Sequence, residues 1–257
     1  METGSSTLEV SQEYDPIIVL PGRAIKNRIP GIYPDLPTKE KAKNNISILH
    51  ACKLLKCYYN QEPSINALVL DGKKMRTTNT LTKLGNKLNN ITIVEYNNST
   101  YEKMLSAKKL NPRIQIYNCH IKEYIDSLNN CFTNVAYFDI MSTFFTSEKS
   151  FGSDIIINKF LKDSLCDEII LAATFCLRNS ISQSHQIQQK KIMILLQKIF
   201  EINGFKYKSL ISDKNLRYKG QNTGNRSMMF VLFFLYKDNI IKLKEDQNDK
   251  DKYIDLY

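Results

Sequence analysis

Short apolar segments alternate with polar, helix-like segments through the middle of this chain, and this alternation limits its fold more than any other feature. Five of the apolar segments have the length and composition of buried strands. They are residues 65–72, 91–96, 113–119, 134–141 and 167–177. A helical pattern follows each of them, at residues 75–88, 98–109, 121–128, 153–165 and 182–203. Near-continuous apolar strands separated by helices predict a parallel sheet that is covered by helices on both faces.

The chain after the fifth helix departs from this alternation. Asn203-Gly204 is a typical helix end, and two further strand patterns, 205–212 and 227–237, are joined by a basic loop without a helical pattern. A parallel crossover needs a connection of about a dozen or more residues, usually a helix, so these two strands are expected to pair antiparallel. The sequence therefore predicts an α/β, Rossmann-like domain with a seven-stranded, mostly parallel sheet and an antiparallel last strand.

Composition along the chain divides it into four regions. The start is polar, and residues 16–37 contain five prolines, which forbid a long helix or a central strand. An amphipathic helix pattern covers residues 38–60, with Thr38 as its expected N-cap. The four regions are a disordered N-terminus at 1–15, a Pro-rich basic arm with an N-terminal helix at 16–64, the α/β domain at 65–237 and an acidic C-terminal tail at 238–257.

The net charge of +10 is unevenly distributed along the sequence. Residues 181–237 hold ten Lys or Arg and two Asp or Glu, and residues 23–56 hold eight and two. Two basic segments predict a polyanionic partner, with nucleic acid as the first expectation and a solvated basic surface as the alternative.

Cations are interleaved with aromatic side chains in two places, as stacking on bases requires. The candidate nucleic-acid-binding residues are Arg23, Lys26, Arg28 and Tyr33 in the arm, and Arg217, Tyr218, Lys219 and Arg226 in the late loop. Either segment could instead dock a protein partner subunit.

Several protein classes are excluded by what the sequence lacks. It has no apolar run of about 18 or more residues, so no transmembrane helix and no membrane partner are expected. It has no basic and apolar leader, which predicts an intracellular protein, cytoplasmic or nuclear and not secreted. Its six cysteines form no CxxC, and no metal site is expected. Cys52 and Cys57 with His50 come nearest, but they lie on a helix pattern that favours core or incidental thiols.

Acidic residues end three of the predicted parallel strands. Asp71, Glu95 and Asp139 stand at the carboxyl ends of the first, second and fourth strand patterns. Open α/β sheets bind their ligands at that edge. Five strand–helix units with a hairpin-like finish, together with these acids, resemble the class I S-adenosylmethionine-dependent methyltransferases over residues 38–237. The resemblance implies the strand order 3-2-1-4-5-7-6, one crevice that both Asp71 and Asp139 face, and S-adenosylmethionine as the cofactor.

The resemblance also implies cofactor-binding residues. After its first strand the family carries acid-x-Gly-x-Gly-x-Gly, whose glycines let the backbone approach the methionine part of the cofactor. Asp71 and Gly72 match this motif, and Lys74 and Arg76 stand in place of the later glycines. Glu95 matches the acid that accepts hydrogen bonds from the ribose hydroxyls, because two carboxylate oxygens suit two vicinal donors. The alternative is a solvated Glu at a strand end.

Two further landmarks follow the third and fourth strands. Asn118 and Cys119 occupy the place where the family contacts the adenine amine. In amino-methylating relatives the fourth strand ends in Asp/Asn-Pro-Pro-Tyr/Phe. Here Asp139 is kept, the prolines are missing, and Phe144 or Phe145 supplies the ring. The resemblance implies that Asp139 accepts hydrogen bonds from a target amine and that Phe144 stacks on a flipped base. The alternative is that Asp139 caps the following helix or turn.

The resemblance predicts an S-adenosylmethionine-dependent methyltransferase that acts on a nucleic acid, either RNA or DNA. Methyl transfer is an in-line displacement in which the cofactor provides the leaving group, so the protein mainly positions and desolvates the reactants. The missing glycines keep a second hypothesis open. In that hypothesis the chain is a catalytically inactive methyltransferase-like subunit that binds nucleic acid or scaffolds a nucleoprotein complex.

Overall fold

The structure is a computed structural model, and it describes residues 39–59, 64–140, 144, 152–177, 184–212, 217–219 and 227–237. All of these residues belong to one compact unit. The predicted disordered N-terminus, the Pro-rich arm and the acidic tail lie outside the described residues.

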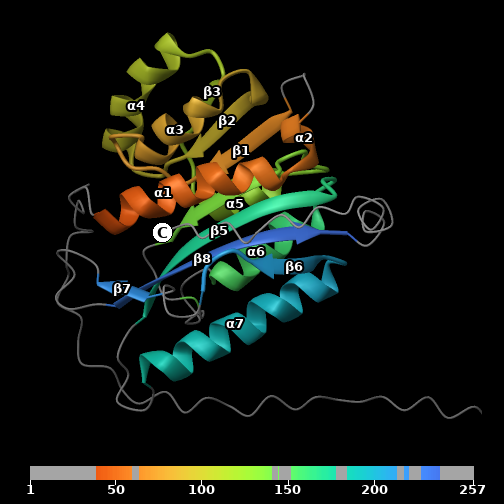
Figure 1. The fold of residues 1–257 in the computed structure, drawn as a ribbon. Helices are drawn as coiled ribbons and strands as arrows, with labels where there is room; N and C mark the ends of the chain where they lie inside the picture. Colours follow the sequence, from red (N-terminus) through yellow and green to blue (C-terminus); the bar gives the residue numbers. More distant parts are fainter. Residues whose placement is uncertain are drawn as a thin grey trace, which may run out of the picture. The chain divides into compact units, whose positions relative to one another are not determined.

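The described strands form one sheet in the order β3-β2-β1-β4-β5-β8-β6, with β7 also paired to β8 (Figure 1). Strands β1 to β5 are parallel to one another, and β8 is antiparallel to both β5 and β6. The strands are β1 (Ile65–Val69), β2 (Leu88–Val94), β3 (Ile114–Tyr117), β4 (Val135–Asp139), β5 (Glu168–Leu177), β6 (Lys206–Ser209), β7 (Arg217–Lys219) and β8 (Ser227–Tyr236). The predicted fold class and strand order are confirmed, because β8 is the predicted seventh strand.

Strand β7 was not predicted, because its sequence was expected to be a loop. Strand β6 pairs only with the C-terminal part of β8, from Phe233 to Tyr236. The N-terminal part of β8 therefore offers backbone groups to another strand, and Arg217 pairs there with Met229. A three-residue strand of this kind has too few positions to show an alternating pattern in the sequence.

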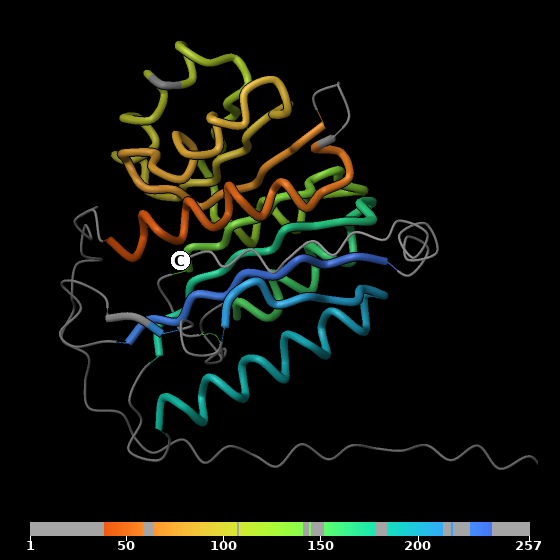
Figure 2. Tube along the Cα trace, in the orientation of Figure 1, coloured from red at the N-terminus to blue at the C-terminus, as the bar shows by residue number. Residues whose placement is uncertain are grey.

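Helices cover both faces of the sheet. The helical segments are α1 (Lys39–Ala51), η1 (Cys52–Leu54), α2 (Lys56–Tyr59), α3 (Arg76–Leu81), η2 (Thr82–Lys87), α4 (Asn98–Leu110), α5 (Ile121–Ser127), α6 (Ser153–Lys162) and α7 (His185–Ile202). One core cluster contains side chains from α1, α3 and α4, and a second contains side chains from α5, α6 and α7. The Cα tube in Figure 2 shows α1 and α7 on opposite sides of the strands. This is the two-sided covering that the apolar strands predicted.

Strand β5 shows why the central strands are so apolar. All of its ten residues are buried. Ile170 and Ala172 face the α1 side, whereas Leu171 and Ala173 face the α7 side. Each Leu or Ile that is fully buried in this way contributes about 1.5–3 kcal/mol. A strand with both faces covered by helices has no solvent face, so its sequence does not alternate.

Helix α1 packs with the sheet, although its sequence was grouped with the preceding arm. Ile48, Ala51 and Leu55 are buried in the cluster that includes β1. The single helix predicted over 38–60 is divided, because Leu55 has extended backbone angles (φ −68°, ψ 134°). One and two turns before Ile48, the same side of α1 carries the polar residues Asn45 and Lys41. This change from apolar to polar along one helix face places side chains of α1 in the site described next.

Candidate functional site

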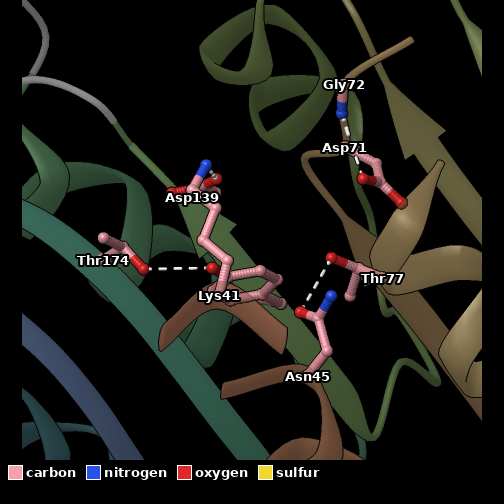
Figure 3. Close-up of polar contacts among 8 residues, drawn as sticks. Lys41, Asn45, Asp71, Gly72, Thr77, Asp139 and Thr174 are labelled. Carbon is pink, nitrogen blue, oxygen red and sulfur yellow. Dashed lines mark hydrogen bonds and ion pairs between the residues drawn. The ribbon is translucent and has the colours of Figure 1, made fainter. Parts of the chain in front are cut away.

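The candidate site lies at the carboxyl edge of the sheet, between β1 and β4. The chain leaves β1 toward β2 and β3 and then returns to β4 on the other side of β1. A reversal of strand order of this kind opens a crevice at the strand ends, where doubly wound folds bind ligands. Figure 3 shows that residues of β4, β5, α1 and α3 and of the turn after β1 meet at this edge.

An ion pair joins α1 to the end of β4. The Lys41 Nζ lies 2.8 Å from the Asp139 Oδ2, although the two residues are 98 positions apart in the sequence (Figure 3). The Lys41 and Asp139 side chains are 29% and 16% exposed, so the pair is partly shielded from water. The other oxygen of the carboxylate, Asp139 Oδ1, is buried and accepts no hydrogen bond from the described residues. A buried carboxylate oxygen without a donor is a costly arrangement, and this one can still accept a hydrogen bond.

Asp71 holds the turn that follows β1. Its Oδ1 accepts a hydrogen bond from the Gly72 backbone N–H at 3.0 Å, and its Oδ2 accepts one from the Thr78 N–H at 2.8 Å. The Thr78 N–H lies in the first turn of α3, so Asp71 caps this helix from outside it. Burial raises the pKa of Asp71 to about 6, and the negative charge of Asp139 adds to the rise. Asp71 and Asp139 stand at the carboxyl ends of the neighbouring strands β1 and β4 (Figure 3).

In the turn between β1 and α3, one residue has the left-handed backbone conformation at a position where the family motif carries glycine. Met75 has φ 48° and ψ 45°, a conformation that costs a residue with a side chain about 1–2 kcal/mol. If Asp71 is the acid of the motif acid-x-Gly-x-Gly-x-Gly, the second glycine position is residue 75. The left-handed backbone, which glycine adopts most easily, therefore falls on Met75 and not on Lys74 or Arg76. The Met75 side chain is buried in the core, and Lys73 and Lys74 are exposed.

Contacts between α1 and α3 continue the site away from the ion pair. The Thr77 hydroxyl donates to the Asn45 Oδ1 at 3.1 Å, in a buried position. On the β4–β5 side, the Tyr137 and Thr174 hydroxyls lie 3.0 Å apart and are also buried. Lys41, Asn45, Tyr137 and Thr174 were not identified from the sequence. The available signal was the spacing of Lys41, Asn45 and Ile48, which puts two polar residues on the apolar face of α1.

The residues predicted to bind adenosine lie at the ends of β2 and β3. Glu95 is half-buried, and its Oε1 accepts a hydrogen bond from the Asn97 N–H at 2.7 Å. Burial raises the pKa of Glu95, and this hydrogen bond opposes the rise. The Asn118 amide donates to the Asn98 Oδ1 at 2.7 Å, and the neighbouring Cys119 is half-buried. The structure therefore brings Glu95, Asn118 and Cys119 to adjacent strand ends, on the side of β1 opposite Asp139.

Phe144 has a position that differs from the predicted one. It is 1% exposed, and its ring packs edge-on against Phe175 with centroids 4.9 Å apart. A ring that belongs to the core offers no open face to a flipped base. Stacking by Phe144 is therefore not supported, and Asp139 faces Lys41 rather than an aromatic residue.

The predicted nucleic-acid-binding residues are described only in part. Arg217 is exposed on β7. For Tyr218 and Lys219 only the backbone in β7 is described, and Arg23, Lys26, Arg28, Tyr33 and Arg226 lie outside the described residues. Within the described ranges no helix is long and apolar enough to cross a membrane, and no cluster of His, Cys, Asp or Glu has a metal-binding arrangement.

Comparisons with known proteins find similarity in structure alone. No protein-family model and no curated protein matches the sequence. TYW2 from M. jannaschii, solved in complex with AdoMet, is 12% identical with a TM-score of 0.50, and the match covers 79% of each chain. TYW2 from P. horikoshii, solved in complex with MeSAdo, is 10% identical with a TM-score of 0.51. That match covers 80% of this chain and 66% of the P. horikoshii protein, just under two thirds of its length. At these identities the similarity shows the fold, and the chain has the fold of the class I S-adenosylmethionine-dependent methyltransferases, as predicted.

Proposed function

We propose that this protein is an S-adenosylmethionine-dependent methyltransferase that transfers the methyl group to a hydroxyl of RNA. The ion pair between Lys41 and Asp139 carries this proposal. It places a cation and a buried, unsatisfied carboxylate oxygen side by side at the ligand-binding edge of a methyltransferase fold.

The carboxyl edge of the sheet has two halves: one at the ends of β1 and β2, with Asp71 and Glu95, and one at the end of β4, with Asp139. The β1–β2 half fits the cofactor. At the motif's three glycine positions Lys73 is exposed, Met75 enters the core, and the small Thr77 side chain lies in the site, where it donates a hydrogen bond to Asn45. The left-handed backbone at Met75 keeps the turn tight. Glu95 offers a half-buried carboxylate to ribose hydroxyls. When bound, the cofactor would supply the methyl group and its own leaving group, and TYW2 from M. jannaschii holds AdoMet in the same fold.

The β4 half of the edge suits an oxygen acceptor better than an amine. A hydroxyl must lose its proton as it is methylated, and the Asp139 Oδ1 is placed to accept a hydrogen bond from it. The Lys41 ammonium then lies beside the developing negative charge on the oxygen and stabilises it. An amine becomes positively charged on methylation, and the same ammonium would repel it. The structure thus favours a different acceptor from the amine that the resemblance implied.

The charge of the chain supports a nucleic acid as the carrier of this hydroxyl. The net charge is +10, and the exposed Arg217 lies close to the same edge. Arg217 pairs with Met229, which in turn pairs with Phe175 near the carboxyl end of β5. Within a polynucleotide the 2′-hydroxyl distinguishes RNA from DNA, so a hydroxyl acceptor points to RNA.

The experiment is a methyl-transfer assay with matched RNA and DNA oligonucleotides and S-adenosylmethionine that carries a deuterated methyl group. The products are digested to nucleosides and analysed by mass spectrometry. The proposal expects the label on the ribose of RNA and none on DNA. Label on a base nitrogen would contradict the hydroxyl acceptor and restore the amine expectation. Cofactor binding with no transfer to either polymer would favour the catalytically inactive subunit.

A further inference from the structure

We infer that the C-terminal segment, residues 238–257, docks in cis on the outward face of α7. This inference does not depend on the proposed function. It rests on the composition of that helix face, the place where the segment leaves the fold, and the match between the two in charge and length.

The outward face of α7 combines apolar and positive side chains. Ile187, Ile194 and Ile202 are 46%, 53% and 79% exposed. The exposed Lys190, Lys191 and Lys198 lie between them at helical spacing, and Glu201 is the acid on the same face. A face of this kind is best covered by a partner that is both apolar and acidic. A second copy of α7 would place lysine against lysine, and phosphates would leave the isoleucines uncovered.

The C-terminal segment leaves the sheet next to the end of this helix. Strand β8 ends at Tyr236, which pairs with Lys206 at the start of β6. Lys206 follows Ile202, the last residue of α7, by four positions. Figure 2 shows the end of the blue strand and the end of the long cyan helix on the same side of the molecule. A segment that continues past β8 therefore starts beside the most exposed isoleucine of the face.

The order of residues along the segment matches the order along α7 read backwards. Apolar residues come first (Ile240, Ile241, Leu243), with Lys242 and Lys244 among them. Four acids follow (Glu245, Asp246, Asp249, Asp251), with Lys250 as the one cation between them, and apolar residues return after Lys252 (Tyr253, Ile254, Leu256). The stretch 245–251 therefore keeps a net charge of −3. In α7 the corresponding order is Ile202, then Lys198, Lys191 and Lys190, with Ile194 among them, and Ile187 last. The fifteen positions from Ile202 to Ile187 span about 22 Å at about 1.5 Å per helical residue. The twenty residues of the segment cover that length in any conformation.

Tethering makes such a contact effective even when it is weak. A short linker holds its end at an effective concentration in the millimolar range. Individual exposed ion pairs contribute only about 0.2–1 kcal/mol each. No single contact is expected to hold the segment on α7. The apolar contacts with the isoleucines and the ion pairs between the four acids and the three lysines are therefore expected to stabilise the docked segment together.

The test is zero-length carbodiimide cross-linking of the full chain, followed by peptide mass spectrometry. The inference expects amide links from Lys190, Lys191 or Lys198 to the acids at 245–251. The K190E/K191E/K198E variant should lose them, whereas the matched K103E/K108E/K109E variant on α4 should keep them. An equal mixture of isotope-labelled and unlabelled chains identifies the occupant. Links within one chain support docking in cis, and links between labelled and unlabelled chains overturn it in favour of a second copy.

A second measurement keeps the inference testable if the charge-reversal variant does not fold. Removal of residues 238–257 should raise the acetylation rate of Lys190, Lys191 and Lys198 by about threefold or more, because a tethered segment bound two-thirds of the time protects by that factor. The rates at Lys103, Lys108 and Lys109 should not change. Equal rates at the α7 lysines with and without the segment would overturn the inference.

Discussion

The two halves of the carboxyl edge hold their carboxylates in different ways. In the β1–β2 half, Asp71 and Glu95 accept hydrogen bonds from backbone N–H groups within seven residues of themselves. In the β4 half, Asp139 is held by Lys41 from a helix 98 positions earlier in the chain. The first half is therefore a local structure that presents acids, and the second is a tertiary contact that brings a cation and an acid together. We interpret the first as the cofactor half and the second as the acceptor half.

Removal of Lys41 should have the largest effect and should separate the two halves. We expect Lys41→Ala to lower the methyl-transfer rate by about 10²-fold or more, because the group that stabilises the acceptor oxygen is lost. Cofactor affinity, which belongs to the other half, should change by less than about twofold. Single-turnover assays and calorimetry measure the two quantities. The control is Lys103→Ala on α4, and an equal loss of cofactor affinity in Lys41→Ala would contradict the separation.

The free energy of unfolding should depend on pH because Asp71 is buried. Its pKa is about 6 in the folded chain against an ordinary value of 3.8. A raised folded-state pKa means that protonated Asp71 favours folding, so this contribution is complete below pH 3.8 and is lost as the pH rises through about 6. The two-unit difference corresponds to about 3 kcal/mol.

Urea unfolding of Asp71→Asn between pH 4 and 7 measures this contribution. The variant should lack the fall in the free energy of unfolding that the natural chain shows over this range. Asp126→Asn, an exposed acid on α5, serves as the control and should keep the fall. Parallel pH curves for the natural chain and Asp71→Asn would show that Asp71 is not buried as described.

Glu95→Gln should weaken the cofactor half alone. An amide keeps one acceptor oxygen but loses the charge and the second acceptor for the ribose hydroxyls. We expect S-adenosylmethionine affinity to fall by about tenfold, since one lost charge-assisted hydrogen bond is worth about 1.5 kcal/mol or more. Calorimetry gives the dissociation constant, and Glu102→Gln on α4 is the matched control. An unchanged constant would assign Glu95 to the turn with Asn97 alone.

The smallest effect is expected at Arg217, which we propose contacts an RNA phosphate. Arg217→Ala should reduce RNA affinity by about threefold and lower the salt dependence of binding by about one unit of slope, as the loss of one phosphate contact does. Fluorescence anisotropy over a series of salt concentrations measures both. Lys108→Ala on α4 is the control, and the same change in both variants would mean that RNA binding has no preferred face.

The difference between the halves also explains what could be predicted from the sequence. The acids at strand ends and the position of the Asp71 turn follow from local patterns, and the strand order follows from the family resemblance; all were predicted. Lys41 was missed because its partner lies 98 residues away and only the packing of α1 brings them together. Phe144 was misassigned because a motif gives the type of a residue but not the direction in which a loop turns its ring. The β7 strand was missed because its pairing depends on how far β6 extends along β8.

Titration of the full chain with S-adenosylmethionine in a calorimeter tests the central claim most directly. The account predicts saturable binding of one cofactor per chain with a micromolar dissociation constant, and binding that survives Lys41→Ala. No detectable heat at millimolar cofactor, from a chain that circular dichroism shows to be folded, would contradict the claim that the β1–β2 half of this edge is a cofactor site.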